Sequence, residues 1–174
     1  MNIRRLLGSC LATAALVSGA AAVVASCGGS PSSAGAVVGR PAPAWSGATI
    51  DGSHLSSGQE RGHWLVLNFF ATWCVPCRRE TPQLVRFVAH PPDVAGSVHV
   101  VGVLYNDSSG AARSFERDHG MTWPIVEDAN DDITSAYGVA GLPQSLVIAP
   151  DGKLVARLFG GVTVATLDAA VGAS

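Results

Sequence analysis

The segment from Trp64 to Leu84 reads WLVLNFFATWCVPCRRETPQL and contains the features that decide the fold. It begins with a nearly continuous apolar run to Phe70, which is typical of a strand buried on both faces. Over residues 75–89 the apolar residues recur at helical spacing, and two prolines at 91 and 92 end that pattern. A buried strand that turns directly into a helix predicts a layered α/β structure.

The segments on either side extend this alternation of strands and helices. We expect, in chain order, a hairpin over 45–55 with its turn at Asp51-Gly52, a strand over 98–105, a helix capped by Ser108 or Ser109 and running to about His119, short elements at 125–126 and 133–137, a hairpin over 144–159, and a helix from Thr163 to about Val171. The predicted fold class is therefore α/β, with a central sheet flanked by helices, one antiparallel edge and an N-terminal β-hairpin.

The beginning of the chain has the pattern of an export signal. Arg4 and Arg5 precede an uncharged segment, Leu6–Ser26, that is rich in Leu, Ala and Val. The residues before Cys27 resemble a bacterial lipobox, so we expect 1–26 to be a lipoprotein signal and Cys27 to be lipidated. A retained transmembrane helix and ordinary cleavage near residue 25 remain alternatives, and each of the three exports the rest of the chain.

Residues 27–42 are composed mainly of Gly, Ser, Pro and Ala, and Arg40 is their one charged residue. This composition predicts a flexible tether, which places the folded domain at 43–174. We therefore expect an extracytoplasmic, monomeric domain anchored at the outer face of the cell membrane.

Composition excludes some classes of partner. Among the 174 residues, 11 are Lys or Arg and 13 are Asp or Glu, for a net charge of −2, and 6% are aromatic. A mildly acidic chain with few aromatic residues offers neither a basic stripe nor stacking platforms, so nucleic acid is not an expected partner.

The cysteine pattern predicts a redox site. Cys10 lies in the leader and Cys27 at its end, so the domain contains only Cys74 and Cys77. A disulfide between residues so close in sequence removes little entropy from the unfolded chain, which makes a stabilising role a poor explanation. Cys74 falls at a predicted helix N-terminus, where the helix dipole favours a thiolate, and Cys77 follows one turn later. We expect Cys74 to attack and Cys77 to resolve the mixed disulfide.

Two further interpretations of this region remain open. A cysteine pair with this spacing is also half of a zinc site, but the chain has no second such pair and its histidines are scattered. Glu80 shares a helical face with Cys77 and is either a solvated residue that favours the helix dipole or a proton acceptor for Cys77. Pro76 is compatible with the first turn of the helix.

Residues 68–84, together with Tyr137-Gly-Val-Ala-Gly-Leu-Pro143, resemble the thioredoxin superfamily, and in particular the membrane-anchored extracytoplasmic thiol-disulfide oxidoreductases of the TlpA, ResA and DsbE type. The resemblance implies a thioredoxin-like fold, a cis proline at Pro143 packed against the cysteine pair, and a backbone at Leu142 that pairs with substrate. It also implies that Glu80 is functional. The chain departs from cytoplasmic thioredoxins at Asn68, where they have aspartate, and from some cytochrome-maturation members at Gln144, where they have glutamate.

These observations combine into a set of expected site residues. The catalytic residues are Cys74, Cys77, Glu80 and Pro143. The substrate-binding residues are Trp73, Val75, Pro76 and Leu142. No metal or cofactor is expected beyond the redox-active disulfide.

The expected function is exchange of the Cys74–Cys77 disulfide with thiols and disulfides of exported proteins, in partnership with a membrane electron donor or acceptor. Reduction is favoured, for example in cytochrome c maturation or in the maintenance of reduced thiols, and oxidation of secreted proteins uses the same atoms. Rivals of other classes are a thiol peroxidase and a copper carrier of related fold. The nearby resolving cysteine argues against the peroxidase, and the two-residue spacing argues against the copper carrier.

Overall fold

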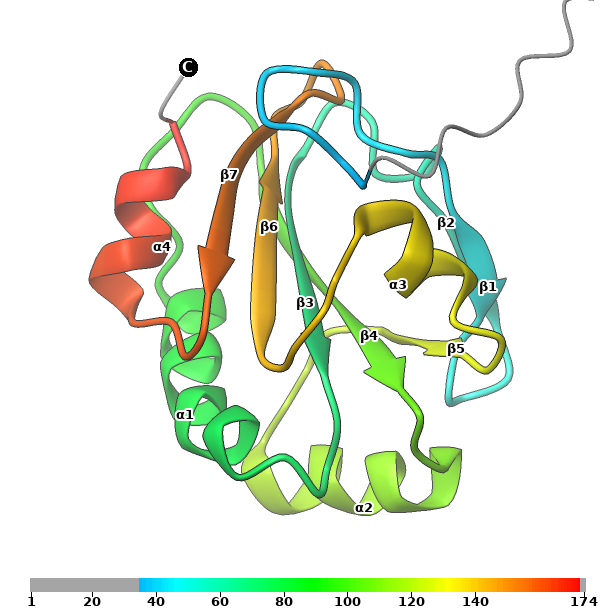
Figure 1. Ribbon diagram of the computed structural model, residues 1–174. Helices are drawn as coiled ribbons and strands as arrows, with labels where there is room; N and C mark the ends of the chain where they lie inside the picture. Colours follow the sequence, from blue (N-terminus) through cyan, green and yellow to red (C-terminus); the bar gives the residue numbers. More distant parts are fainter. Residues whose placement is uncertain (1–34, 173–174) are drawn as a thin grey trace, which may run out of the picture. The chain divides into compact units, whose positions relative to one another are not determined.

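The computed structural model describes residues 35–172 (Figure 1). Its elements are, in chain order, β1 (Ser46–Ala48), β2 (His54–Ser56), β3 (Trp64–Phe70), α1 (Val75–Ala89), β4 (Val98–Tyr105), α2 (Ser109–His119), β5 (Ile125–Asp128), α3 (Asp132–Tyr137), β6 (Gln144–Ile148), β7 (Leu154–Phe159) and α4 (Val164–Ala170). The predicted order of strands and helices is confirmed, and the boundaries shift by only a few residues.

Strand β3 lies at the centre of a five-stranded mixed sheet with the order β5-β4-β3-β6-β7. It pairs in parallel with β4 and antiparallel with β6, and all seven of its residues are buried. Its apolar residues divide between two cores, with Val66 and Phe70 in one and Leu67 and Phe69 in the other. The apolar run therefore reflects a strand covered on both faces, because successive side chains point to opposite sides.

The two faces of the sheet are covered by different elements. Helices α1, α2 and α4 contribute to the core that also contains both cysteines. Helix α3 packs on the other core with Trp45, which precedes the β1–β2 hairpin, so α3 covers the opposite face of the sheet from the other three helices. The thioredoxin-like arrangement with an N-terminal hairpin is confirmed.

The folded part begins before the boundary at residue 43 that we expected. Gly39 N–H donates to the carbonyl of Leu154 at 2.7 Å, and Leu154 N–H donates to the carbonyl of Arg40 at 2.9 Å. The guanidinium of Arg157 also donates to the carbonyl of Ala36 at 2.7 Å. Composition alone missed this packing, because β7 is an edge strand whose backbone groups can pair with a Gly- and Ala-rich segment.

The predicted signal over 1–26, the lipidation site Cys27 and the first part of the tether lie outside the described residues. Within 35–172, no helix combines the length and apolar character required to cross a membrane.

Candidate active site

The two cysteines of the domain lie at the start of α1, as the sequence predicted. Cys74 is the N-cap residue, and its sulfur accepts a hydrogen bond from the backbone N–H of Cys77 at 3.2 Å. The two sulfurs form a disulfide with an S–S distance of 2.07 Å. Cys74 retains 6% of its exposure and Cys77 only 1%, so the first of the two is the more accessible to an incoming partner.

Exposed apolar side chains surround the disulfide. Trp73 is 58% exposed and Val75 is 55% exposed, and Pro76 is also on the surface. Trp73 lies on the loop before α1, and Val75 and Pro76 are the first residues of the helix. The loop is tied to the segment after β4, because the side chain and backbone N–H of Thr72 both donate to Asp107, at 2.6 and 2.7 Å. These contacts hold the loop in place, while its apolar side chains remain available for a partner.

The segment before β6 lies at the same end of the sheet. The register pairs Gln144 with Phe69, so Pro143 lies where the chain leaves β3 for the cysteines. The Leu142–Pro143 peptide bond is cis, as the resemblance implied, and the Pro143 carbonyl accepts a hydrogen bond from Gly160 N–H at 3.1 Å. Leu142 is half-buried.

Glu80 is buried, with only 3% of its surface exposed, so the solvated interpretation of this residue is wrong. One carboxylate oxygen, Oε1, accepts a hydrogen bond from the Asn68 side-chain amide at 2.8 Å. The other, Oε2, accepts from the backbone N–H of Val162 at 2.9 Å. In this disulfide form both oxygens are therefore held by neutral N–H donors.

This environment shifts the acidity of Glu80 toward neutral pH. Burial raises its pKa to about 7, because the ionised form loses its hydration, while the hydrogen bonds from Asn68 and Val162 act in the opposite direction. A carboxyl group with a pKa near 7 can both accept and release a proton at physiological pH.

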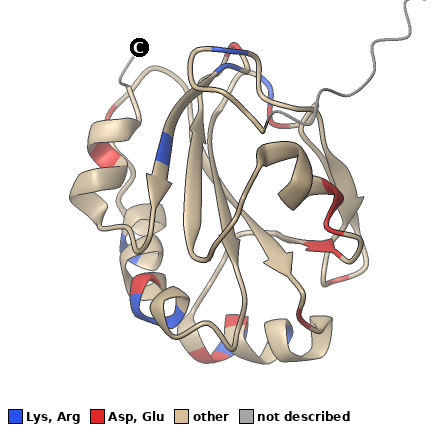
Figure 2. Cartoon of the chain, in the orientation of Figure 1, with Lys and Arg blue, Asp and Glu red and all other residues tan. Residues whose placement is uncertain are grey.

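A pocket of about 280 Å³ opens beside Glu80. Its walls include Pro76, Arg79 and Val162. The pocket therefore gives access to the surroundings of the Glu80 carboxylate from the side of α1 on which Pro76 lies. The first half of α1 carries both basic and acidic positions (Figure 2).

The structure thus brings the predicted cysteines, their exposed neighbours and Glu80 together on one short segment. Sequence reasoning missed Val162, a partner of Glu80 from a distant segment, and Ser145, which accepts a hydrogen bond from Asn68. It singled out Asn68 only as a departure from a pattern. It also missed Phe159, which is 77% exposed and pairs in register with Gln144 beside Pro143. The signal in the sequence that could have identified Phe159 was an aromatic residue at the end of a predicted strand.

Among residues 35–172, no group of three or more His, Cys, Asp and Glu side chains has an arrangement that could hold a metal ion.

Comparisons with known proteins agree with this geometry. Residues 38–157 match the model of the AhpC/TSA family. The thiol-disulfide oxidoreductase ResA of Geobacillus thermodenitrificans is 32% identical over 126 residues, which cover 72% of this chain and 71% of that protein.

Solved structures show the same fold. A secreted Mycobacterium tuberculosis disulfide oxidoreductase homologous to Escherichia coli DsbE superposes with a TM-score of 0.66 at 25% identity, over 75% of this chain and 96% of the other. A thiol:disulfide interchange protein of the thioredoxin family from Chlorobium tepidum gives 0.64 at 29% identity, over 75% and 92%. Taken with the disulfide at the start of α1, these matches show that the chain belongs to the AhpC/TSA family of thioredoxin-like proteins and is a thiol-disulfide oxidoreductase of the ResA and DsbE type.

Proposed function

We propose that this oxidoreductase reduces disulfides in exported proteins, with Cys74 as the attacking sulfur, Cys77 as the resolving sulfur and Glu80 as the proton acceptor. The observation that carries the proposal is the buried carboxylate of Glu80, one turn of α1 beyond Cys77, with its pKa raised to about 7. Pro143 and Leu142 shape the groove in which the substrate lies, and Trp73, Val75 and Pro76 contact it.

The reaction balances with the groups of the chain and the substrate. In the reduced enzyme the Cys74 thiolate attacks one sulfur of the substrate disulfide, so that a mixed disulfide forms and the other substrate sulfur leaves as a thiolate. The Cys77 thiol then transfers its proton to the Glu80 carboxylate and attacks the Cys74 sulfur. The Cys74–Cys77 bond forms, the remaining substrate sulfur leaves and takes up a proton, and two electrons have passed to the substrate.

The position of Cys74 supports this order of attack. It caps α1 and accepts the Cys77 N–H, and both the bond and the helix dipole favour negative charge on its sulfur. Cys77 is nearly inaccessible and reacts within the molecule. Regeneration of the dithiol requires an electron donor, for which we propose a membrane thiol-disulfide protein.

The proposed location is the outer side of the cell membrane, with a lipid on Cys27 as the anchor. The export pattern of residues 1–26 supports it, and one structural relative is described as secreted. Exported proteins whose cysteine pairs have formed disulfides are the corresponding substrates, oxidised apocytochrome c among them. Loss of radiolabelled palmitate incorporation in Cys27→Ala, with the wild type labelled, is the expected result, and equal labelling would reject the anchor.

A redox titration tests the direction of electron flow. The Cys74–Cys77 couple is equilibrated with mixtures of reduced and oxidised dithiothreitol, and the thiol fraction is measured by alkylation. A reductant is expected to have a potential near that of thioredoxin, about −270 mV. A value near that of a strong periplasmic oxidant, about −120 mV, would assign the protein to disulfide formation instead.

A trapping experiment tests the order of attack. Cys77→Ser leaves Cys74 able to attack but removes the resolving sulfur, so mixed disulfides with exported proteins should accumulate through Cys74. Cys74→Ser provides the matched control and should trap none. Equal recovery of partners from both variants would contradict the assigned roles.

A further inference from the structure

Asn68 connects the proton acceptor to the strand that follows Pro143. Its side-chain nitrogen donates one hydrogen to Glu80 Oε1 at 2.8 Å and the other to the hydroxyl oxygen of Ser145 at 3.0 Å. Asn68 is 2% exposed, Ser145 is fully buried, and the two residues are direct partners in the β3–β6 register. Both N–H groups of the amide are therefore committed inside the protein.

The carboxylate determines which end of the amide faces Glu80, because an ionised carboxylate can only accept hydrogen bonds. If the amide were turned over, its oxygen would meet the carboxylate oxygen, and the carboxylate would lose a buried donor, which costs about 1–3 kcal/mol. The Ser145 hydroxyl accepts the second N–H and so fixes the position of the amide against the carboxylate.

The remaining surroundings of Glu80 contain few charges. Val162, from the loop after β7, donates its backbone N–H, and Cys77 lies on the same helix. Arg79 lines the adjacent pocket on its exposed side, but no ion pair with Glu80 occurs among the described residues. The ionised carboxylate therefore depends on the two neutral donors, one of which is a side chain that does not titrate.

We propose that Asn68, anchored by Ser145, is a positioning residue for the proton transfer: it holds the Glu80 carboxylate and favours its ionised form, and so sets the pH at which Cys77 is deprotonated. This inference rests on the proposed role of Glu80. The Asn68–Ser145 contact also links the proposed substrate groove to the proton acceptor, because Ser145 lies on β6, two residues after Pro143.

The direction of the effect follows from the hydrogen bond. Burial raises the pKa of Glu80, and the bond from Asn68 lowers it, so loss of that bond leaves the carboxyl group protonated to higher pH. An upward shift of one unit in the pKa of Glu80 reduces the ionised fraction of its carboxyl group about ten-fold at pH values below that pKa.

The experiment measures the rate at which Cys77 resolves a Cys74 mixed disulfide with glutathione, from pH 5 to pH 9. In Asn68→Ala the inflection should move upward by about one unit, with a rate about ten-fold lower near pH 6 and rates that converge by pH 9. Ser145→Ala should shift the inflection in the same direction by less, and Ser145→Thr, which keeps the hydroxyl, should restore it. Carbon-13 NMR of labelled glutamate carboxyl groups should show the same displacement for Glu80.

A matched control separates positioning from general loss of stability. Thr49 is also buried, and its hydroxyl hydrogen-bonds to Ser53 in the N-terminal hairpin at 2.7 Å. Thr49→Val should lower the melting temperature without moving the inflection. If Asn68→Ala and Ser145→Ala likewise lower only the melting temperature, Asn68 is a purely structural residue and the inference is overturned.

The outcomes also distinguish the inference from the function on which it rests. If Glu80→Gln leaves the wild-type pH profile unchanged, the role of Glu80 fails. If Glu80→Gln removes the inflection but neither Asn68→Ala nor Ser145→Ala displaces it, only the role of Asn68 fails.

Discussion

Two buried or nearly buried glutamates lie at opposite ends of the central strands, and they have different kinds of partner. Glu80, near the carboxyl end of β3, contacts two neutral N–H donors. Glu60, which precedes β3, is 9% exposed and accepts a hydrogen bond from His99 Nδ1 at 2.7 Å. His99 can carry a positive charge, so this second carboxylate has a counter-ion that the first one lacks.

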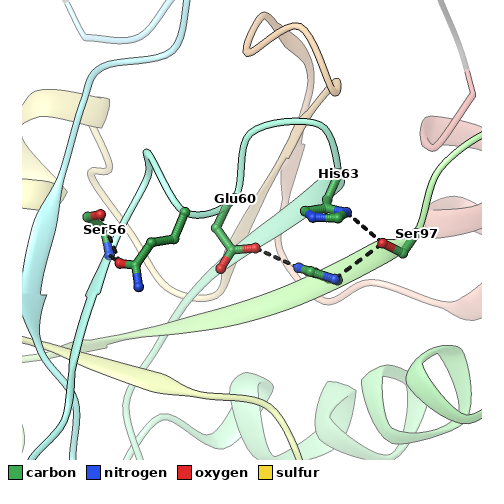
Figure 3. A network of polar contacts seen from close by, with 6 residues as sticks. Ser56, Glu60, His63 and Ser97 are labelled. Atoms are coloured by element: carbon green, nitrogen blue, oxygen red, sulfur yellow. Dashed lines mark hydrogen bonds and ion pairs between the residues drawn. The ribbon is translucent and has the colours of Figure 1, made fainter.

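The cluster around Glu60 is shown in Figure 3. The rings of His63 and His99 stack with their centroids 4.3 Å apart, and the hydroxyl of Ser97 lies 2.6 Å from His63 Nδ1. These residues connect the segments that lead into β3 and β4, and His99 is 40% exposed. The cluster therefore has access to water and to a partner charge.

The different partners of Glu80 and Glu60 indicate what makes a carboxylate suited to proton transfer. A carboxylate paired with a potential cation serves as a structural contact, since the charge of each group is compensated. A carboxylate buried with neutral donors alone remains close to the balance between its two protonation states. The following variants test this contrast between the Glu80 and Glu60 clusters.

The largest effect is expected at the attacking sulfur, Cys74, which lies at the same end of the sheet as Glu80. Cys74→Ser removes the nucleophile and should reduce disulfide exchange by at least about a thousand-fold, because the remaining contacts supply no attacking group. The measurement is turnover of a disulfide peptide with dithiothreitol as the reductant. Undiminished turnover would remove the reason for placing the active site at this end of the sheet.

Glu80→Gln should slow resolution of the mixed disulfide by about a hundred-fold at pH 7, the usual scale of a lost acid–base group. The wild type should show an inflection near the pKa of Glu80, about 7, with the rate rising as the carboxylate ionises. The variant should lack this inflection. Its rate should approach that of the wild type above about pH 8.5, where a thiol ionises without help.

The same carboxylate should make stability depend on pH. The pKa of Glu80 is raised from 4.5 to about 7 on folding, so the folded state retains a proton that the unfolded state releases. Stability should therefore be greatest below pH 4.5 and fall as the pH rises through 7, by roughly 2–3 kcal/mol between pH 5 and pH 8 from this group.

Urea unfolding of the oxidised protein at a series of pH values measures this dependence. Glu80→Gln should flatten it, although the variant starts from a lower stability because an amide oxygen can replace only one of the two carboxylate acceptors. An equal slope in both proteins would show that other groups control it.

The smallest effect is expected at the other end of the strands. Glu60→Gln keeps an acceptor for His99 and should cost about 1 kcal/mol or less, since an ion pair with one partner substantially exposed contributes little. Exchange kinetics should be unchanged, and a shift in their pH profile would erase the contrast between the two clusters.

Local signals in the sequence were sufficient for much of the fold. The helix that starts at Cys74, the N-cap at Ser108 and the Asp-Gly turn after β6 each depend on residues close together in the chain. Such preferences operate over a few residues, so a single sequence reveals them. The apolar run of β3 likewise predicted a strand covered on both faces.

Local patterns in the sequence did not predict the contacts between segments that are far apart in the chain. The segment over residues 36–42 looked like part of a tether because its composition is that of a linker, yet its backbone pairs with the start of β7. Spacing alone favoured a solvated Glu80, and only the family resemblance argued for its function. Its burial depends on packing between α1, β3 and the loop after β7.

The order of residues along the chain is enough to identify the atoms that can react: two sulfurs separated by two residues at a helix start, followed by a carboxyl group on the same face. The tertiary structure decided the acidity of that carboxyl group, because its donors come from Asn68, 12 residues earlier, and Val162, 82 residues later. Residue types and short spacings establish chemical identity, whereas a pKa depends on hydration and on neighbours in space, which exist only once the chain has folded.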